Sequence, residues 1–185
     1  MNEINTSEQS NIYILTKLAM SVALICILGP IIIPLPFSPI PVSFTQIAIY
    51  ISIYVIGYKL ATYSTIIYIL MGLIGLPVFS GYTGGLHIII GPTGGYLVGF
   101  IFLTFFTGFF IDKYSNNIYL TILGYIIGNL FNYTIGSIWL TYSSNISIKS
   151  AIFIGVIPYI IADIIKVIVS IFIGTCLKKS LKNIK

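Results

Sequence analysis

The sequence predicts an all-α integral membrane protein, with six transmembrane helices and external loops folded over the helix bundle. Hydrophobic residues make up 57% of the 185 positions and charged residues only 7%, whereas a soluble domain carries about 25% charged residues. About 20 apolar residues cross the ~30 Å hydrocarbon core of a bilayer. A chain of this length therefore holds six crossings with short links, and we expect residues 1–185 to form a single membrane domain.

Charges, prolines and glycines divide the apolar sequence into six segments. The first follows a polar start with Glu3 and Glu8 and lacks a small-residue cleavage site, so we expect a retained helix and not a signal peptide. The second and third are short and separated only by Tyr58 and Lys59, which predicts a tight helical hairpin or a locally thinner membrane. The expected helices are residues 12–33, 43–57, 60–76, 95–111, 117–140 and 151–177.

Lysines predict the orientation, because cytoplasmic loops retain basic residues. All nine basic residues are lysines, mainly at segment ends or in the tail, a pattern of topology signals and not of a nucleic-acid surface. With the N-terminus inside, only Lys149 is external and Lys166 lies within a helix. Both termini are then cytoplasmic, and the links 34–42, 77–94 and 141–150 are external. The seven cytoplasmic lysines are Lys17, Lys59, Lys113, Lys178, Lys179, Lys182 and Lys185.

Two of these external links are too apolar for solvated loops. They read IPLPFSPIPVSFT and GYTGGLHIIIGPTGGY, and irregular backbone at membrane depth is tolerated only where it packs in protein or lines a cavity. We interpret them as a lid and a wall over the bundle. Gly84, Gly85, Gly94 and Gly95 would then permit positive backbone dihedrals or let a ligand approach the main chain; ordinary turns are the alternative interpretation.

Asp163 and Lys166 are the charged residues that most require an explanation, because they lie inside the last apolar segment. Each charge costs roughly 2.5–3.5 kcal/mol at the centre of a transmembrane helix. Three residues apart, the two side chains share a helix face and can pair. They form either a structural ion pair or a polar anchor for a ligand that carries donors, acceptors or a negative charge.

Small residues four apart let two helices approach closely. Internal packing is the default interpretation of such pairs, and only Ala19 with Ala23 has a claim to face another protein. Asn129 and Asn132 place amides in the outer half of the helix 117–140, near Trp139, which could equally be an interfacial anchor. The glycine pairs are Gly95 with Gly99 and Gly124 with Gly128.

Motifs for catalysis are missing from the sequence. It contains no GxxxxGK[ST], GxGxxG, HExxH or GxSxG pattern and no paired carboxylates. His87 is the single histidine, and Cys26 and Cys176 have no partners at ligand spacing. We therefore expect no enzyme activity, no metal and no cofactor. If transport is active, another subunit must hydrolyse the nucleotide.

A series of short motifs resembles the BioY family, the biotin-binding S components of energy-coupling factor (ECF) transporters. The motifs are IPVSFTQ, GLPVFSGYTGGL, GPTGGYLVGF, IGSIWLTY and DIIK, and the similarity runs from about residue 15 to 177. The resemblance implies a six-helix subunit that captures biotin from outside, in a bacterial cytoplasmic membrane. It also implies three partners, namely a membrane coupling subunit (T component) and two ATP-binding subunits.

The resemblance also implies binding roles for some residues: Gln46, Thr83, the 94–97 stretch, Asp163 and Lys166 match ligand contacts of the family, whereas Gly84, Asn132 and Trp139 are candidates from the residues alone. Ala19 and Ala23 match an alanine pair that faces the coupling subunit in this family. Some relatives carry asparagine in place of Thr83, arginine in place of Leu97, and proline and glycine in place of Ile161 and Ala162, which leaves more of the carboxylate recognition to Lys166 or to backbone N–H groups. The candidate ligand-binding residues are Gln46, Thr83, Gly84, Gly94, Gly95, Tyr96, Asn132, Trp139, Asp163 and Lys166.

Two other functions are compatible with the same residues. An S component for another vitamin would share the fold and the coupling mode with a different pocket. A membrane structural or assembly protein would use the ion pair for architecture and bind no ligand. A ligand-dependent rise in thermal stability separates these possibilities, because a ligand that binds only the folded state stabilises it.

Overall fold

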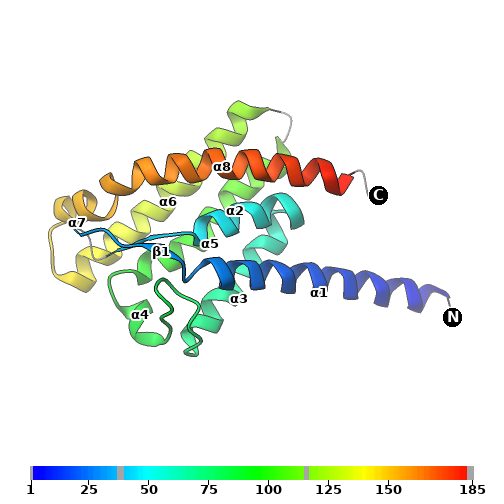
Figure 1. Cartoon of the computed structure of the whole chain (residues 1–185), viewed down its shortest axis with the longest axis horizontal. Helices are drawn as coiled ribbons and strands as arrows, with labels where there is room; N and C mark the ends of the chain where they lie inside the picture. The colour runs from blue at the N-terminus through cyan, green and yellow to red at the C-terminus, as the bar shows by residue number, and fades with distance from the viewer. Residues whose placement is uncertain (1, 37–39, 115–116, 183–185) are drawn as a thin grey trace.

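Helices form most of the structure, which confirms the expected all-α class (Figure 1). The computed structural model describes residues 2–36, 40–114 and 117–182. The start of α1 and the end of α8 lie at one end of the bundle, and α4 and α7 lie toward the other (Figure 1). The helices are α1 (Asn2–Leu28), α2 (Thr45–Ile56), α3 (Tyr58–Leu73), α4 (Leu86–Ile90), α5 (Gly94–Lys113), α6 (Ile118–Ser144), α7 (Ile148–Gly155) and α8 (Ile157–Lys182).

Four helical stretches among the described residues are long and apolar enough to cross a membrane. They are Asn11–Leu28, Gly94–Lys113, Ile118–Ser144 and Ile148–Leu177. Helices α2 and α3 are shorter, with 12 and 16 residues, and a single glycine joins them. Gly57 adopts φ 79° and ψ 165°, a conformation that glycine reaches without a steric penalty. Asp112 Oδ2 accepts a hydrogen bond from the Tyr58 backbone N–H at 2.8 Å. This bond satisfies one of the backbone N–H groups that have no partner inside the helix at the start of α3.

The first helix ends earlier than the sequence predicted, and the expected end at Ile33 is wrong. Helix α1 stops at Leu28, because Pro30 has no backbone N–H to donate and disfavours a helical conformation at the residue before it. Instead, β1 (Ile32–Ile33) pairs antiparallel with β2 (Val42–Ser43), with Ile32 opposite Ser43 and Ile33 opposite Val42. This short ladder holds the two ends of the proline-rich link together.

The last expected helix is divided in two. Helix α7 ends at Gly155, and Val156 leaves the helical region at φ −126° and ψ −58°. Pro158 cannot donate a backbone hydrogen bond to Ile154, so a continuous helix would lose an internal bond at this position. The freed Gly155 carbonyl accepts a hydrogen bond from Tyr96 Oη at 3.0 Å. The break therefore ties α7 to the beginning of α5.

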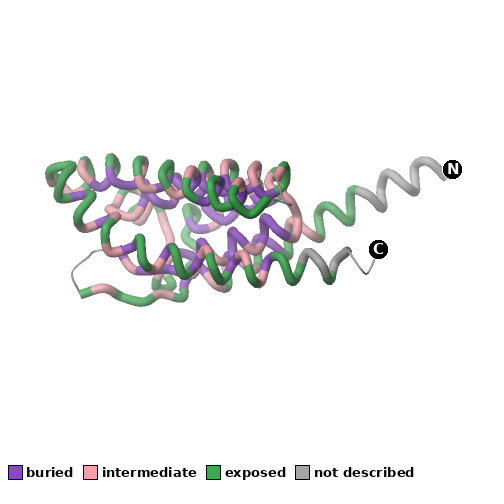
Figure 2. The backbone as a smooth tube through the Cα atoms, turned by 90° about the horizontal axis from the view of Figure 1, so that it is seen from above, coloured by how far each residue is buried: buried purple, intermediate pink, exposed green. Residues whose placement is uncertain are grey.

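The core lies on the inner faces of the helices, which Figure 2 shows as purple segments inside the bundle. Ile25, Ile49, Tyr68 and Leu103 from α1, α2, α3 and α5 are all fully buried. Glycines let α5 and α6 pack closely: a Cβ at Gly124 would lie 2.4 Å from Phe110 Cβ. At Gly128, Gly99 and Gly95 the corresponding distances are 2.1 Å to Thr107 Oγ1, 2.3 Å to Asn132 Oδ1 and 2.2 Å to Trp139 Cβ. The expected internal packing of the glycine pairs is confirmed.

Candidate ligand-binding site

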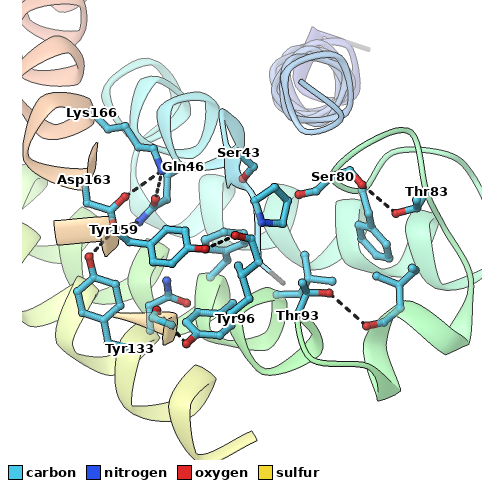
Figure 3. A pocket seen from close by; sticks show the side chains of 18 residues that line it. Ser43, Gln46, Ser80, Thr83, Thr93, Tyr96, Tyr133, Tyr159, Asp163 and Lys166 are labelled. Carbon is cyan, nitrogen blue, oxygen red and sulfur yellow. Dashed lines mark hydrogen bonds and ion pairs between the residues drawn. The ribbon is translucent and has the colours of Figure 1, made fainter. Parts of the chain in front are cut away.

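A cavity of about 220 Å³ lies among α2, α5, α6, α8 and the two apolar links (Figure 3). Residues from the start of α2, the start of α5 and the first half of α8 contribute to it, so it lies toward the end of the bundle away from the start of α1 and the end of α8 (Figure 1). The lining residues are Ile40, Pro41, Ser43, Gln46, Phe79, Ser80, Thr83, Ile88, Thr93, Tyr96, Leu97, Phe100, Asn132, Tyr133, Gly155, Tyr159, Asp163 and Lys166.

Four polar side chains from three helices meet at one side of this cavity. Lys166 Nζ donates to Asp163 Oδ1 at 2.9 Å and to Gln46 Oε1 at 2.8 Å. Asp163 Oδ2 accepts from Tyr133 Oη at 2.5 Å and from Gln46 Nε2 at 3.4 Å. Gln46, Asp163 and Lys166 are all buried. The attraction between the two unlike charges and the hydrogen bonds around them offset the cost of removing Lys166 and Asp163 from water. Ionised groups are buried only when this cost is offset.

This cluster keeps donor and acceptor capacity for a ligand. An ammonium group has three N–H donors, and among the described residues two acceptors occupy two of those on Lys166. The Tyr133 hydroxyl uses its proton on Asp163, so its oxygen lone pairs can accept. The cavity lining also includes the apolar side chains of Phe79, Leu97 and Phe100. The site therefore matches a ligand with an apolar body and a polar group that accepts and donates.

Six of the ten sequence-predicted binding residues line this cavity. Thr83 reaches it from the 77–94 link, where its hydroxyl donates to the Ser80 carbonyl at 3.0 Å. Asn132, on α6, is only 3% exposed, and none of its contacts holds its Oδ1 by a hydrogen bond within the described part of the chain. The six residues are Gln46, Thr83, Tyr96, Asn132, Asp163 and Lys166.

The other four predicted residues do not line the cavity. A Cβ at Gly84 would lie 2.1 Å from the Leu76 carbonyl oxygen, and one at Gly94 would lie 1.6 Å from the Ile89 carbonyl oxygen. Gly95 packs against Trp139, whose Nε1 donates to the Gly91 carbonyl at 3.1 Å. These residues fold the 77–94 link on itself and fasten it to α6.

The sequence suggested two reasons for the glycines of this link, namely positive backbone dihedrals and close approach of a ligand to the main chain. These two reasons are incomplete. Of Gly84, Gly85, Gly94 and Gly95, only Gly85 has a positive φ, at 104°. The other three are glycines because neighbouring chain atoms leave no room for a side chain. A local sequence pattern does not show such a requirement, because the obstructing atoms belong to other turns or helices.

Sequence reasoning missed several lining residues, of which Tyr133 and Tyr159 are the most informative. Tyr133 follows Asn129 by four residues on α6, so a search for polar side chains at helical spacing would have found it. Tyr159 Oη donates to the Ile40 carbonyl and so connects α8 to the proline-rich link. The remaining polar ones are Ser43, Ser80 and Thr93.

Ala19 and Ala23 lie in a separate apolar groove on the outside of α1 and α3. Both alanines are exposed, and the groove has a volume of about 390 Å³. Its other lining residues are Leu15, Leu18, Val22, Cys26, Ile67 and Met71. None of them lines the polar cavity, so the two surfaces are distinct.

No metal site accompanies the cavity in the described part of the chain. No three His, Cys, Asp or Glu side chains lie close enough there to share an ion. The polar groups that face the cavity are amides, hydroxyls and one ion pair, which bind organic ligands through hydrogen bonds and charge.

Comparisons with known proteins agree on one family. The family model described as "BioY family" matches residues 3–183. The biotin transporter BioY of Thermotoga maritima is 35% identical over 80% of this chain and 86% of its own length, and the biotin transporter BioY of Lactococcus lactis subsp. cremoris is 34% identical over 89% and 90%. A crystal structure of the S-component for biotin from an ECF-type ABC transporter has a TM-score of 0.83 and 32% identity, covering 92% of this chain and 93% of that one. The chain belongs to the BioY family.

Proposed function

We propose that this chain is the membrane-embedded S component of an ECF-type uptake system and that it captures biotin in the cavity between α2, α5, α6 and α8. The observation that carries the proposal is the buried cluster of Gln46, Asp163 and Lys166 at the side of an otherwise largely apolar cavity. Relatives that carry the name biotin transporter, and a solved biotin S-component with the same fold, support biotin as the ligand.

The chemistry of biotin suits this cavity. Its fused rings and valeryl chain require an apolar, aromatic surface, which Phe79, Leu97 and Phe100 supply. Its ureido group carries donors and acceptors, and its carboxylate requires a cation or oriented N–H groups. We assign the third N–H of Lys166 to an acceptor atom of biotin, and the Tyr133 oxygen and the Asn132 amide to its remaining polar atoms.

The membrane arrangement that supports this function has six crossings, formed by α1, α2, α3, α5, α6 and the α7–α8 pair. The start of α1 and the end of α8 lie at the same end of the bundle (Figure 1), as an even number of crossings requires. The lysine distribution places that end in the cytoplasm. Both apolar links contribute residues to the cavity, including Pro41 and Thr83, so we place them over its outer side. The membrane is the bacterial cytoplasmic membrane.

Energy for uptake comes from partners. We propose that the groove around Ala19 and Ala23 receives a helix of the membrane coupling subunit, because small exposed side chains let two backbones approach. Two ATP-binding subunits complete the transporter, in accord with a sequence that lacks the phosphate-binding loop. The chain itself is a binding subunit and not an enzyme.

A vitamin panel tests the ligand. The purified full-length protein is unfolded thermally with biotin, thiamine or riboflavin. Biotin at a hundredfold excess over its Kd should stabilise the fold by about 2.7 kcal/mol. Stabilisation by thiamine or riboflavin, with none by biotin, would identify an S component for another vitamin. An unchanged transition with all three would favour a structural role.

A further inference from the structure

Asn129 lies next to the polar cluster without lining the cavity. It is half-buried on α6, one turn before Tyr133. Its Oδ1 accepts from Gln46 Nε2 at 2.9 Å. Its Nδ2 donates to the Tyr125 backbone carbonyl at 2.9 Å and to Tyr50 Oη at 3.0 Å. Both ends of the Asn129 amide are therefore engaged.

These contacts fix the orientation of two side-chain amides that are hydrogen-bonded to each other, those of Asn129 and Gln46. A backbone carbonyl only accepts hydrogen bonds, so the Tyr125 carbonyl requires Nδ2 of Asn129 on its side and leaves Oδ1 facing Gln46. An oxygen acceptor there requires Nε2 of Gln46, which turns Oε1 toward Lys166. The Lys166 ammonium can only donate hydrogen bonds, and in this orientation Gln46 Oε1 is the acceptor that faces it.

The opposite orientation of the Gln46 amide would be unfavourable at three contacts. Its Nε2 would face the Lys166 ammonium, donor against donor, and its Oε1 would face Oδ1 of Asn129 and Oδ2 of Asp163. Unpaired polar atoms and like charges are costly in a buried environment. With Gln46 turned correctly, two N–H groups of Lys166 are held by protein acceptors, and the third has a defined direction.

We propose that Asn129 is a positioning residue, which orients the Gln46 amide and thereby directs the free N–H of Lys166 toward the ligand. The inference rests on the proposed function, because it assigns to Asn129 a part in recognising the same ligand. Asn129 acts through Gln46 and does not touch the ligand itself. Its contribution to affinity therefore depends on Gln46 being present, and its contribution to stability does not.

A double-mutant cycle separates these two contributions. Biotin affinity is measured for the wild type, Asn129→Leu, Gln46→Leu and the double variant, each in detergent and each shown to be folded by its thermal transition. Asn129→Leu should weaken biotin binding about tenfold in the wild-type background, the upper end of what one net hydrogen bond contributes. In the Gln46→Leu background the same change should alter affinity less than about twofold.

Thr104→Val is the matched control, because it removes a different buried hydrogen bond of the bundle. Thr104 Oγ1 lies 3.1 Å from Thr65 Oγ1 on α3, and neither residue lines the cavity. This variant should lose stability without losing biotin affinity. Asn129→Ala serves as a second variant if leucine does not fit.

Three results would overturn the proposal. They are an equal loss of affinity in both backgrounds, an unchanged affinity of Asn129→Leu in the wild-type background, and failure of both Asn129 variants to fold. Failure of the proposed function can be told apart from failure of this proposal, because it is seen in which vitamin the wild type binds. If the wild type binds thiamine or riboflavin and not biotin, the same cycle with that vitamin tests Asn129. If it binds none of the three, both proposals are wrong.

Discussion

Lys166 Nζ lies 2.9 Å from Asp163 Oδ1, one turn away on α8, and both side chains are buried beside the cavity. The same two charges therefore belong to the architecture and to the proposed binding site. An ion pair in a low-dielectric interior tolerates the removal of both partners better than the removal of one. Stability and ligand affinity can thus be separated by comparing single and double variants.

The first prediction concerns stability. Lys166→Met leaves the Asp163 carboxylate buried, and among the described residues only Tyr133 and Gln46 still donate hydrogen bonds to it, so the change should cost about 3–5 kcal/mol. Adding Asp163→Leu removes the stranded charge and should restore most of that loss. Thermal unfolding without ligand measures both changes. A double variant as unstable as Lys166→Met would show that the cost does not come from the uncompensated carboxylate.

The second prediction concerns Gly94. A Cβ there would lie 1.6 Å from the Ile89 carbonyl oxygen, so Gly94→Val must displace the link between α4 and α5. We expect a lower unfolding temperature without any ligand, with a free-energy cost of about 1–3 kcal/mol. If Gly94 instead served the ligand directly, the unliganded transition would stay unchanged and only biotin affinity would fall.

A third prediction addresses the Ala19 groove. Ala19→Trp should leave biotin affinity intact, because the groove shares no residue with the cavity, and should reduce recovery of the complex with the coupling and ATP-binding subunits. Met20→Trp is the control, since Met20 is 69% exposed on the same helix and lies outside the groove. Loss of biotin binding in Ala19→Trp would assign Ala19 to internal packing.

Membrane topology gives a fourth prediction. In a variant with Cys26 and Cys176 replaced by serine, a cysteine at Tyr82 should react with an impermeant reagent added to whole cells. A cysteine at Lys59 should react only after the membrane is permeabilised. Both positions are exposed in the structure, so access to the reagent depends on the side of the membrane. The reverse pattern would invert the proposed orientation.

The sequence predicted the helical fold well, because long apolar runs leave few alternatives in a chain of this composition. It predicted Asp163 and Lys166 for a related reason: charged residues are rare enough in apolar helices to be conspicuous. Gln46 came only from the resemblance to the BioY family. Tyr133 was missed because this chain has 14 tyrosines, and the signal that marks it, its spacing of four residues from Asn129, was not searched for.

Other features depend on contacts that no local pattern contains. Gly95 is small because Trp139, on another helix, occupies the space beside it. The break between α7 and α8 did have a local signal in Pro158, but prolines within transmembrane helices are often tolerated, so the hydrophobic run was interpreted as continuous. The end of α1 had the same kind of signal in Pro30, hidden by the three isoleucines that follow it.

Biotin affinity in the Asp163→Leu, Lys166→Met double variant tests the central claim most directly, namely that the buried cluster binds the ligand. The variant is first shown to fold by its thermal transition, and its Kd for biotin is then compared with that of the wild type. The account predicts a loss of at least about tenfold, or roughly 1.4 kcal/mol, because the ligand loses a charge-assisted donor. Wild-type affinity in the folded double variant would contradict the claim and leave the ion pair as architecture alone.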